Sequence, residues 1–149
     1  MADKILNENI TKQVKDAFDK QLSRPVRVMY FGKQTDCDYC ADTLQLVDEV
    51  AALSDRIDLE VLDIEKDSAI ARQFHVERAP SLVIAGRDGD QIQDYGIRFA
   101  GIPSGYEFSS LIQGLVLVSN RDSALQQKTR QSLKELKEPV NMLVFTTPT

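Results

Sequence analysis

Residues 26–40 of the chain read VRVMYFGKQTDCDYC. The stretch begins with strand-forming residues, continues through a polar loop and ends in two cysteines, Cys37 and Cys40, three positions apart. After them, Leu44, Val47 and Val50 recur with helical spacing. A Cys-x-x-Cys pair between a strand and a helix is a redox arrangement, because unpaired N–H groups and the dipole of the first helical turn stabilise a thiolate at the first cysteine. The second cysteine lies on the same helical face, so we expect a reversible disulfide.

The composition is that of an ordinary globular domain, with 149 residues, 42% of them hydrophobic and 28% charged. The net charge of −5 and the pI near 4.9 disfavour a nucleic-acid partner, because phosphate-binding proteins usually carry a basic surface. No apolar run reaches the roughly 18 residues of a membrane helix, and the first residues lack the apolar centre of a secretory signal. The sequence therefore predicts a cytoplasmic protein without a membrane segment.

Strand and helix patterns alternate on both sides of the cysteine pair. Residues 8–22 carry apolar side chains at every fourth position, which predicts a helix. The remaining elements are a strand around residues 57–61, a short helix over 66–75, a strand over 81–85, a hairpin turn over 86–90, a weaker strand, a loop over 96–105 and a helix over 106–119. This order indicates an α/β fold with a mixed central sheet flanked by helices.

The C-terminal residues do not fit this domain. They predict a polar helix over 123–137 and then a strand with no neighbour to pair with. The segment Pro139–Phe145 reads PVNMLVF and resembles PVRVMYF at Pro25–Phe31, and a leucine stands three residues before each proline. We therefore divide the chain into a domain over 1–120, a linker helix over 121–138 and, over 139–149, the first strand of a second unit in a truncated fragment.

Charged residues beside the cysteines affect the expected balance between thiol and disulfide. Asp36 and Asp38 flank Cys37, and Lys33 is the nearest cation in the sequence. Neighbouring carboxylates disfavour the thiolate, which favours the disulfide and makes the couple more reducing, unless the lysine folds back onto the site. Tyr39, between the cysteines, packs either against a substrate or against the core.

Non-redox uses of the cysteines are weaker alternatives. A structural zinc site needs about four ligands, whereas Cys37, Cys40 and His75 are the only soft ligands in the chain. A static disulfide across so short a loop stabilises little, and two inert buried thiols are a further alternative. The glycines of residues 96–105 lack the strand-then-helix setting of a dinucleotide motif. We therefore expect no metal, nucleotide or flavin to be bound.

The strand, loop, CDYC and helix, followed by Ala79-Pro80-Ser81 at the start of a later strand, resemble the thioredoxin fold, here with an extra N-terminal helix. The resemblance implies that Pro80 is a cis-proline facing the cysteines and that the Ala79 backbone pairs with a substrate strand. Thioredoxins also place an acid in the strand before the motif, and residues 26–31 contain none. The proton of Cys40 then leaves through water or through another acid such as Asp63 or Glu65.

A closer resemblance rests on the N-terminal helix, on residues 95–108 (YGIRFAGIPSGYEF) and on the start of a second unit. Together they resemble the glutaredoxin-like protein disulfide oxidoreductases, which are cytoplasmic tandem thioredoxin-fold proteins. The resemblance implies a protein disulfide oxidoreductase that acts in cell redox homeostasis. Cys37 and Cys40 would exchange disulfides with protein substrates held by Tyr39, Ala79 and Pro80, and a thioredoxin-reductase-like flavoprotein would reduce the pair. A second Cys-x-x-Cys would follow residue 149, so its contribution is not carried over, and the activity of the fragment alone is open.

Two alternative functions remain open at the level of sequence. The first is an electron-relay module of the alkyl hydroperoxide reductase type, although in that family the second unit typically keeps the Cys-x-x-Cys, whereas here the first unit has it. The second is a redox-inactive unit that binds client chains along the groove at Ala79 and Pro80. A client-binding unit would keep its affinity after replacement of Cys37 by serine.

Overall fold

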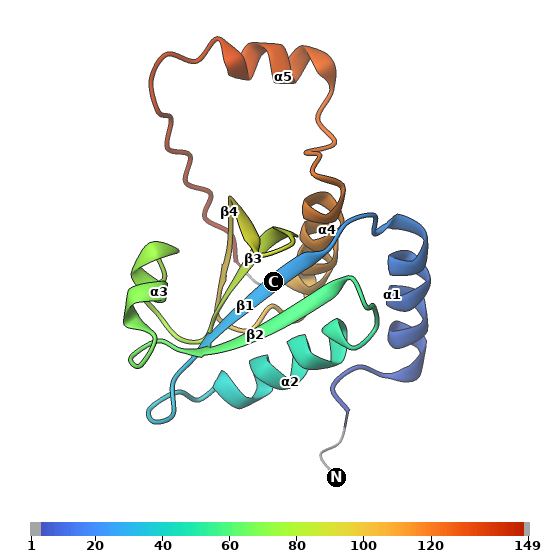
Figure 1. Ribbon diagram of the computed structural model, residues 1–149, viewed down its shortest axis with the longest axis vertical. Helices are drawn as coiled ribbons and strands as arrows, with labels where there is room; N and C mark the ends of the chain where they lie inside the picture. The colour runs from blue at the N-terminus through green and yellow to red at the C-terminus, as the bar shows by residue number, and fades with distance from the viewer. Residues whose placement is uncertain (1–3, 148–149) are drawn as a thin grey trace.

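A computed structural model describes residues 4–147 of the chain (Figure 1). Its elements in chain order are α1 (Glu8–Gln21), β1 (Val26–Gly32), α2 (Cys40–Ala51), β2 (Ile57–Asp63), α3 (Ser68–Gln73), β3 (Ser81–Asp88), β4 (Gln91–Ala100), α4 (Tyr106–Asn120) and α5 (Gln127–Lys134). The predicted alternation of helices and strands, closed by a hairpin and a helix, is confirmed.

The four strands form one mixed sheet in the order β2-β1-β3-β4. β1 pairs in parallel with β2, beginning with Val26 opposite Ile57, and antiparallel with β3, where Val26 stands opposite Gly86. β3 and β4 form an antiparallel hairpin. Because β1 has neighbours on both edges and helices over both faces, its sequence is an almost continuous apolar run rather than an alternating one.

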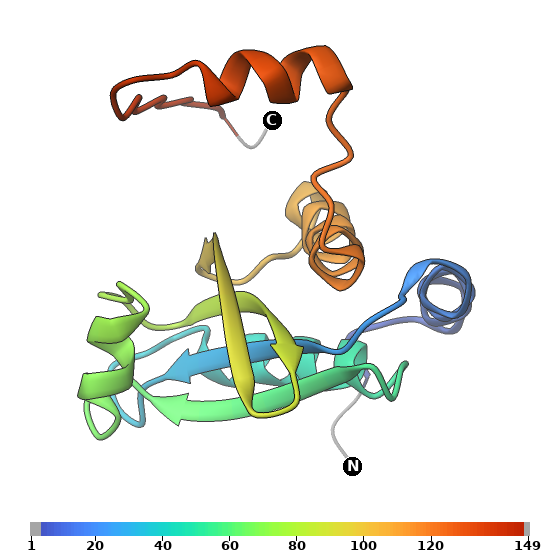
Figure 2. The same ribbon diagram turned by 45° about the horizontal axis from the view of Figure 1, so that its top comes forward.

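Helices cover both faces of the sheet (Figures 1 and 2). On one face, Val28 and Tyr30 of β1 belong to a core that also contains buried residues of α1, α2 and α4. On the other face, Met29 and Phe31 pack in a second core with Ala71 of α3 and the adjacent Phe74 and Val76. The two cores hold β1 between them and so fix the position of the cysteine loop that follows it. The predicted thioredoxin-type architecture with an additional N-terminal helix is therefore present.

Both ends of α1 are anchored. The Asn7 side chain accepts a hydrogen bond from the Ile10 N–H at 2.9 Å, which caps the helix. After the helix, the Ser23 N–H donates to the hydroxyl oxygen of Ser119 in α4 at 2.9 Å, and Ser119 is fully buried. These bonds join the helix before β1 to the helix that closes the sheet.

A buried arginine marks the end of the packed domain. Arg121 follows α4 in the left-handed conformation, and its side chain is only 8% exposed. Its guanidinium donates to the carbonyl oxygens of Val118, Pro25 and Arg87. Gly86 makes room for it, because a Cβ there would lie 2.6 Å from the guanidinium carbon. Arg121 therefore joins α4, the start of β1 and the β3–β4 hairpin.

Several boundaries differ from those expected from the sequence. α2 begins at Cys40 rather than Cys37, and α3 is shorter than the predicted helix over 66–75. The region expected as a loop over 96–105 is strand up to Ala100, because Gly96, at φ 81°, lies in an irregularity of the β3–β4 pairing rather than at a strand end. A glycine inside a strand pattern frequently marks such a bulge.

The C-terminal segment differs from the rest of the described chain. α5 covers only part of the predicted linker helix and buries no residue. Residues 139–147 form no regular secondary structure, and their apolar side chains are exposed, up to 90% for Phe145. The rest of the expected strand, residues 148–149, lies outside the described residues, so the three-part division of the chain stays a prediction. Within residues 4–147, no helix is long and apolar enough to cross a membrane.

Candidate functional site

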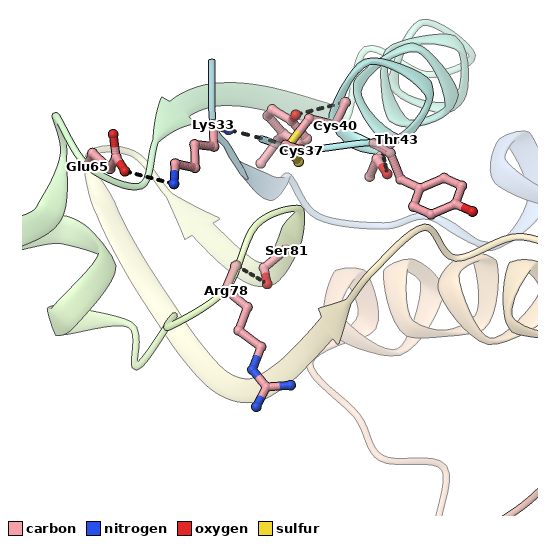
Figure 3. Close-up of a disulfide and its surroundings, with 9 residues drawn as sticks. Lys33, Cys37, Cys40, Thr43, Glu65, Arg78 and Ser81 are labelled. Carbon is pink, nitrogen blue, oxygen red and sulfur yellow. Dashed lines mark hydrogen bonds and ion pairs between the residues drawn. A yellow bond between two sulfur atoms is a disulfide. The ribbon is translucent and has the colours of Figure 1, made fainter. Parts of the chain in front are cut away.

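Cys37 and Cys40 form a disulfide between β1 and α2, with their Cα atoms 5.5 Å apart (Figure 3). Cys37 lies in the loop before α2 and is partly exposed, whereas Cys40 is the first residue of the helix and is 7% exposed. The sequence reasoning placed Cys37 in the first helical turn, and the structure corrects this by three residues. The two sulfurs therefore differ in accessibility, with Cys37 the one that an incoming molecule can reach.

The end of β1 supports Cys40 from below. The hydroxyl of buried Tyr30 donates to the Cys40 carbonyl oxygen at 2.8 Å, and the Lys33 N–H donates to Cys40 Sγ at 3.4 Å. Burial raises the pKa of Tyr30, so the phenol stays protonated as a donor. Gly32 allows the close approach, because a Cβ at this position would collide with the Tyr30 ring. The first turn of α2 is thus fixed to the strand that precedes it.

Tyr39 stands between the cysteines as the residue before the first helical turn. Its carbonyl oxygen accepts hydrogen bonds from the Thr43 N–H at 2.9 Å and from the Thr43 hydroxyl at 2.6 Å. Thr43 is fully buried, whereas Tyr39 itself is 59% exposed. The core position considered for Tyr39 is therefore wrong, and its ring is available at the surface.

The charged residues around the pair are arranged so that no cation contacts the sulfurs through an ion pair in the described chain. The Lys33 ammonium binds Glu65 at 3.0 Å, and Figure 3 shows the lysine side chain running away from the disulfide toward that carboxylate. Hydrogen bonding and the charge of Glu65 raise the pKa of Lys33, and the nearby Asp36 and Asp63 contribute in the same direction. Asp36 and Asp38 are exposed beside Cys37. The lysine therefore does not fold back onto the cysteines.

The loop before β3 belongs to the surroundings of the disulfide (Figure 3). The Ala79–Pro80 peptide bond is cis, as the resemblance implied. The Ser81 hydroxyl donates to the Arg78 carbonyl oxygen at 2.6 Å, and the Gly101 N–H donates to the Pro80 carbonyl oxygen at 2.8 Å. Pro80 is buried and Ala79 partly exposed. The loop is thus held by β3 on one side and by the chain after β4 on the other.

A cavity of about 410 Å³ opens beside Cys40 and is also lined by Lys33, Asp63 and Asp67. Glu65, one of the two acids considered for the Cys40 proton, does not line it. The N–H groups of Lys66 and Glu65 lower the pKa of Asp63 by hydrogen bonding to its carboxylate, which makes Asp63 a weak base. The cavity gives Cys40 a polar side that the exposed sulfur of Cys37 does not need.

No group of three or more histidine, cysteine or acidic side chains among residues 4–147 is arranged to hold a metal ion. His75 follows α3 and is exposed. Its contribution to the chemistry at Cys37 has no structural support.

Sequence reasoning missed two features of the site. Tyr30 was counted among strand formers, and its hydroxyl bond to Cys40 depends on the turn between β1 and α2, which no periodicity encodes. The pairing of Lys33 with Glu65 joins the end of β1 to the turn after β2. The parallel register of those two strands, with Gly32 opposite Asp63, was the only available signal.

Comparisons with known proteins agree with this geometry. A protein disulfide oxidoreductase from Aeropyrum pernix K1 superposes with a TM-score of 0.74 at 28% identity, over 92% of this chain and 57% of that one. The alkyl hydroperoxide reductase AhpF of Enterococcus faecalis superposes with a TM-score of 0.77 at 25% identity, over 88% of this chain and 61% of that one. No protein-family model matches the chain.

Curated relatives point in the same direction. The alkyl hydroperoxide reductase AhpF of Pseudomonas aeruginosa is 31% identical over 130 residues, which is 87% of this chain and 22% of that protein. A protein named NADH dehydrogenase from Ferdinandcohnia aciditolerans is 38% identical over 95 residues, or 64% of this chain and 15% of that protein. The chain thus spans less than a quarter of the length of these relatives. It is a thioredoxin-fold chain of the thiol–disulfide oxidoreductase type, similar to protein disulfide oxidoreductases and to the alkyl hydroperoxide reductase AhpF.

Proposed function

We propose that the chain exchanges disulfides with protein substrates through Cys37 and Cys40. In the reducing direction, the Cys37 thiolate attacks one sulfur of a substrate disulfide, and the other substrate sulfur leaves as a thiolate that takes up a proton. The Cys40 thiolate then attacks Cys37 Sγ and releases the second substrate sulfur. The substrate gains two electrons and two protons, and the Cys37–Cys40 disulfide closes; the reverse sequence oxidises a dithiol.

The observation that carries this proposal is the unequal exposure of the two sulfurs. Cys37 is partly exposed and outside the helix, whereas Cys40 is 7% exposed and at its start. An accessible sulfur suits attack on another protein, and a sheltered sulfur suits resolution of the mixed disulfide, because a substrate cannot easily compete for it.

The test is the thiol state of the pair across a series of dithiol and disulfide buffers, read by alkylation and mass. We expect a reversible two-electron transition between about −180 and −300 mV, the range of redox catalysts and their buffers. Thiols that never pair, or that pair irreversibly, would exclude the proposed function for this chain.

Trapping experiments assign the two roles. Cys40→Ser leaves the mixed disulfide at Cys37 unresolved, so we expect it to accumulate covalent complexes with disulfide-bonded proteins. Cys37→Ser is the matched control, and we expect it to trap far less. Equal trapping by both variants would contradict the assignment of Cys37 as the attacking residue.

Substrate binding is assigned to Tyr39, Ala79 and Pro80. The exposed Tyr39 ring and the partly exposed Ala79 backbone flank the accessible cysteine in sequence and in the loop before β3. We expect Tyr39→Ala to raise the KM for a protein disulfide while leaving the reduction potential of the pair within experimental error. A shifted potential with an unchanged KM would remove Tyr39 from this set.

A second candidate function is electron relay to a peroxidase. It is favoured by the matches to the alkyl hydroperoxide reductase AhpF, both in sequence and in structure. The two functions differ in the acceptor: a relay module reduces the disulfide of a peroxidase much faster than it reduces insulin, whereas a general oxidoreductase reduces both at similar rates. Single-turnover oxidation of the reduced chain by each acceptor distinguishes them.

A redox-inactive client-binding unit is the third alternative. In that case Cys37→Ser would bind unfolded chains as tightly as the unaltered protein does. We expect instead that the substitution removes the covalent step, so that capture of disulfide-bonded clients is lost.

The electron donor and the setting complete the proposal. A thioredoxin-reductase-like flavoprotein is the donor we infer, because the relatives include a reductase of that general kind of system. We place the activity in the cytoplasm and in cell redox homeostasis, and we assign residues 139–149 to the first strand of a second thioredoxin-fold unit. Flavin-dependent NADPH or NADH oxidation coupled to reduction of Cys37–Cys40 tests the donor.

A further inference from the structure

The turn after β2 supplies a carboxylate that controls the nearest lysine to the disulfide. Lys33 follows the end of β1, and its backbone N–H is already at Cys40 Sγ, at 3.4 Å. Its ammonium is bound by Glu65 at 3.0 Å, and the side chain points away from the sulfurs (Figure 3). The lysine is therefore attached to the site by its backbone while its charge is held elsewhere.

The other charges around Lys33 are also carboxylates. Asp36 and Asp63 add to the field that raises the lysine pKa, and Asp67 lines the same cavity as Lys33 and Cys40. Asp36 precedes Cys37 in the left-handed conformation, at φ 53°, which places this acid in the turn next to the accessible sulfur. A thiolate at the pair therefore forms in a negative environment unless a cation comes near.

We infer that Glu65 is a positioning residue that makes the Cys37–Cys40 couple more reducing by holding the Lys33 ammonium away from the sulfurs. A cation beside a thiolate stabilises the reduced form and makes a couple more oxidising, so withholding the cation has the opposite effect. This inference rests on the proposed function, because a potential matters only for a pair that cycles. It adds a regulating residue two elements away from the motif.

The size of the effect is limited by solvent. The side chains of Lys33 and Glu65 are 31% and 65% exposed, so water and salt screen the charge. We expect Glu65→Gln to shift the equilibrium constant for reduction of the disulfide by roughly threefold in favour of the dithiol, or about 15 mV for two electrons. We also expect the shift to shrink as the salt concentration rises.

The experiment is a double-mutant cycle in dithiothreitol redox buffers, on the complete chain. In each buffer, the dithiothreitol dithiol gives two electrons and two protons to the Cys37–Cys40 disulfide and closes to its own disulfide. The four proteins are the unaltered chain, Glu65→Gln, Lys33→Met and the double variant. Glu135→Gln, an exposed glutamate beyond α5, is the control for loss of one negative charge far from the site.

If Glu65 acts through the lysine, its substitution shifts the potential when Lys33 is present and by less than half as much in the Lys33→Met background. Equal shifts in both backgrounds would overturn the inference, because Glu65 would then act by its own charge. An unshifted or lower potential in Glu65→Gln would also overturn it. These results leave the proposed function intact, whereas an unaltered pair with no reversible transition overturns both.

A second readout does not depend on equilibrium with a buffer. In a Cys40→Ser background, the pH dependence of Cys37 alkylation gives the thiol pKa. We expect Glu65→Gln to lower this pKa and the addition of Lys33→Met to reverse the change. A purely structural role of Glu65 would alter stability without moving the alkylation profile in this paired way.

Discussion

Two segments of the molecule have nearly the same sequence and opposite structures. Pro25–Phe31 contains most of the central strand β1, and Phe31 is fully buried. Pro139–Phe145 carries the same spacing of apolar residues, yet it forms no strand and its Phe145 is 90% exposed. An apolar strand pattern therefore becomes a strand only where neighbours satisfy its backbone and cover its faces.

The comparison also shows which kind of strand the second segment would become. In β1, Val28 and Tyr30 face one core while Met29 and Phe31 face the other, so both faces need cover. Met142, Leu143, Val144 and Phe145 repeat that two-faced pattern. An edge strand would show alternating polar residues instead. The segment has the sequence of a central strand, which supports the proposed second unit.

The largest expected effect comes from truncating the equivalent phenylalanines. Phe31→Ala opens a cavity in the packed core, so we expect it to lower the free energy of unfolding by about 3–5 kcal/mol. Phe145→Ala removes an exposed side chain and should change it by less than about 0.5 kcal/mol. Urea unfolding followed by circular dichroism measures both. A large loss for Phe145→Ala would mean that this segment is buried in solution.

The next effect tests where the packed domain ends. Arg121→Ala removes the guanidinium that binds three buried carbonyl groups, so we expect a loss of about 1–3 kcal/mol. Arg130 also pairs with an aspartate, at 2.6 Å, but its side chain is 38% exposed. Arg130→Ala should therefore cost less than about 0.5 kcal/mol. Similar losses in the two variants would place α5 inside the cooperative domain.

A smaller effect concerns the N-terminal end, which is anchored where the C-terminal end is not. Burial opposes ionisation of Glu49, but hydrogen bonds from the Leu6 N–H, Gln45 and the Ile5 N–H outweigh it and lower the Glu49 pKa below its ordinary value of 4.5. A lowered folded-state pKa contributes stability that is present above the unfolded value and is lost as the pH falls through the folded value.

We therefore expect Glu49→Gln to cost about 0.5–1.5 kcal/mol at neutral pH, since charge-assisted bonds become neutral ones. The difference from the unaltered protein should shrink as the pH falls below 4.5. Urea unfolding at several pH values measures it. A difference that stays constant with pH would mean that the carboxylate charge is not what holds residues 5 and 6.

The smallest effect on stability is expected from deleting the residues after Asp122. These residues bury nothing from α5 onward, so the free energy of unfolding should change by less than about 0.5 kcal/mol. Their removal should instead abolish self-association, because exposed apolar strand sequence invites pairing with another copy. Light scattering on both forms checks this. A dimer that persists without the segment would locate the contact elsewhere.

The sequence predicted the parts of the fold that depend on periodicity. The apolar stripe of α1, the strand-forming run of β1 and the alternation that gives an α/β sheet were all visible in the pattern. The Cys37–Cys40 pairing followed from spacing, since positions three apart at a helix start share a face. Pro80 was placed by resemblance, and its peptide bond is cis.

The remaining features depend on three-dimensional proximity that no local pattern encodes. β4 continues past Gly96 because a bulge absorbs the glycine, whereas the glycine alone suggested a loop. The start of α2 at Cys40 is set by the turn through Asp36, whose positive φ is not written in the sequence. The Tyr30 hydroxyl and the Lys33–Glu65 pair each join segments that meet only after the sheet forms.

The hydrogen bond from Tyr30 to the first residue of α2 also gives the protein a built-in optical reporter. The chain contains no tryptophan and only four tyrosines, so tyrosine emission is not masked. Tyr30 is bonded to the Cys40 carbonyl and Tyr39 lies inside the motif, and a neighbouring disulfide quenches tyrosine fluorescence. Opening of the Cys37–Cys40 bond should therefore brighten the native protein, which allows its turnover to be followed in real time without any label.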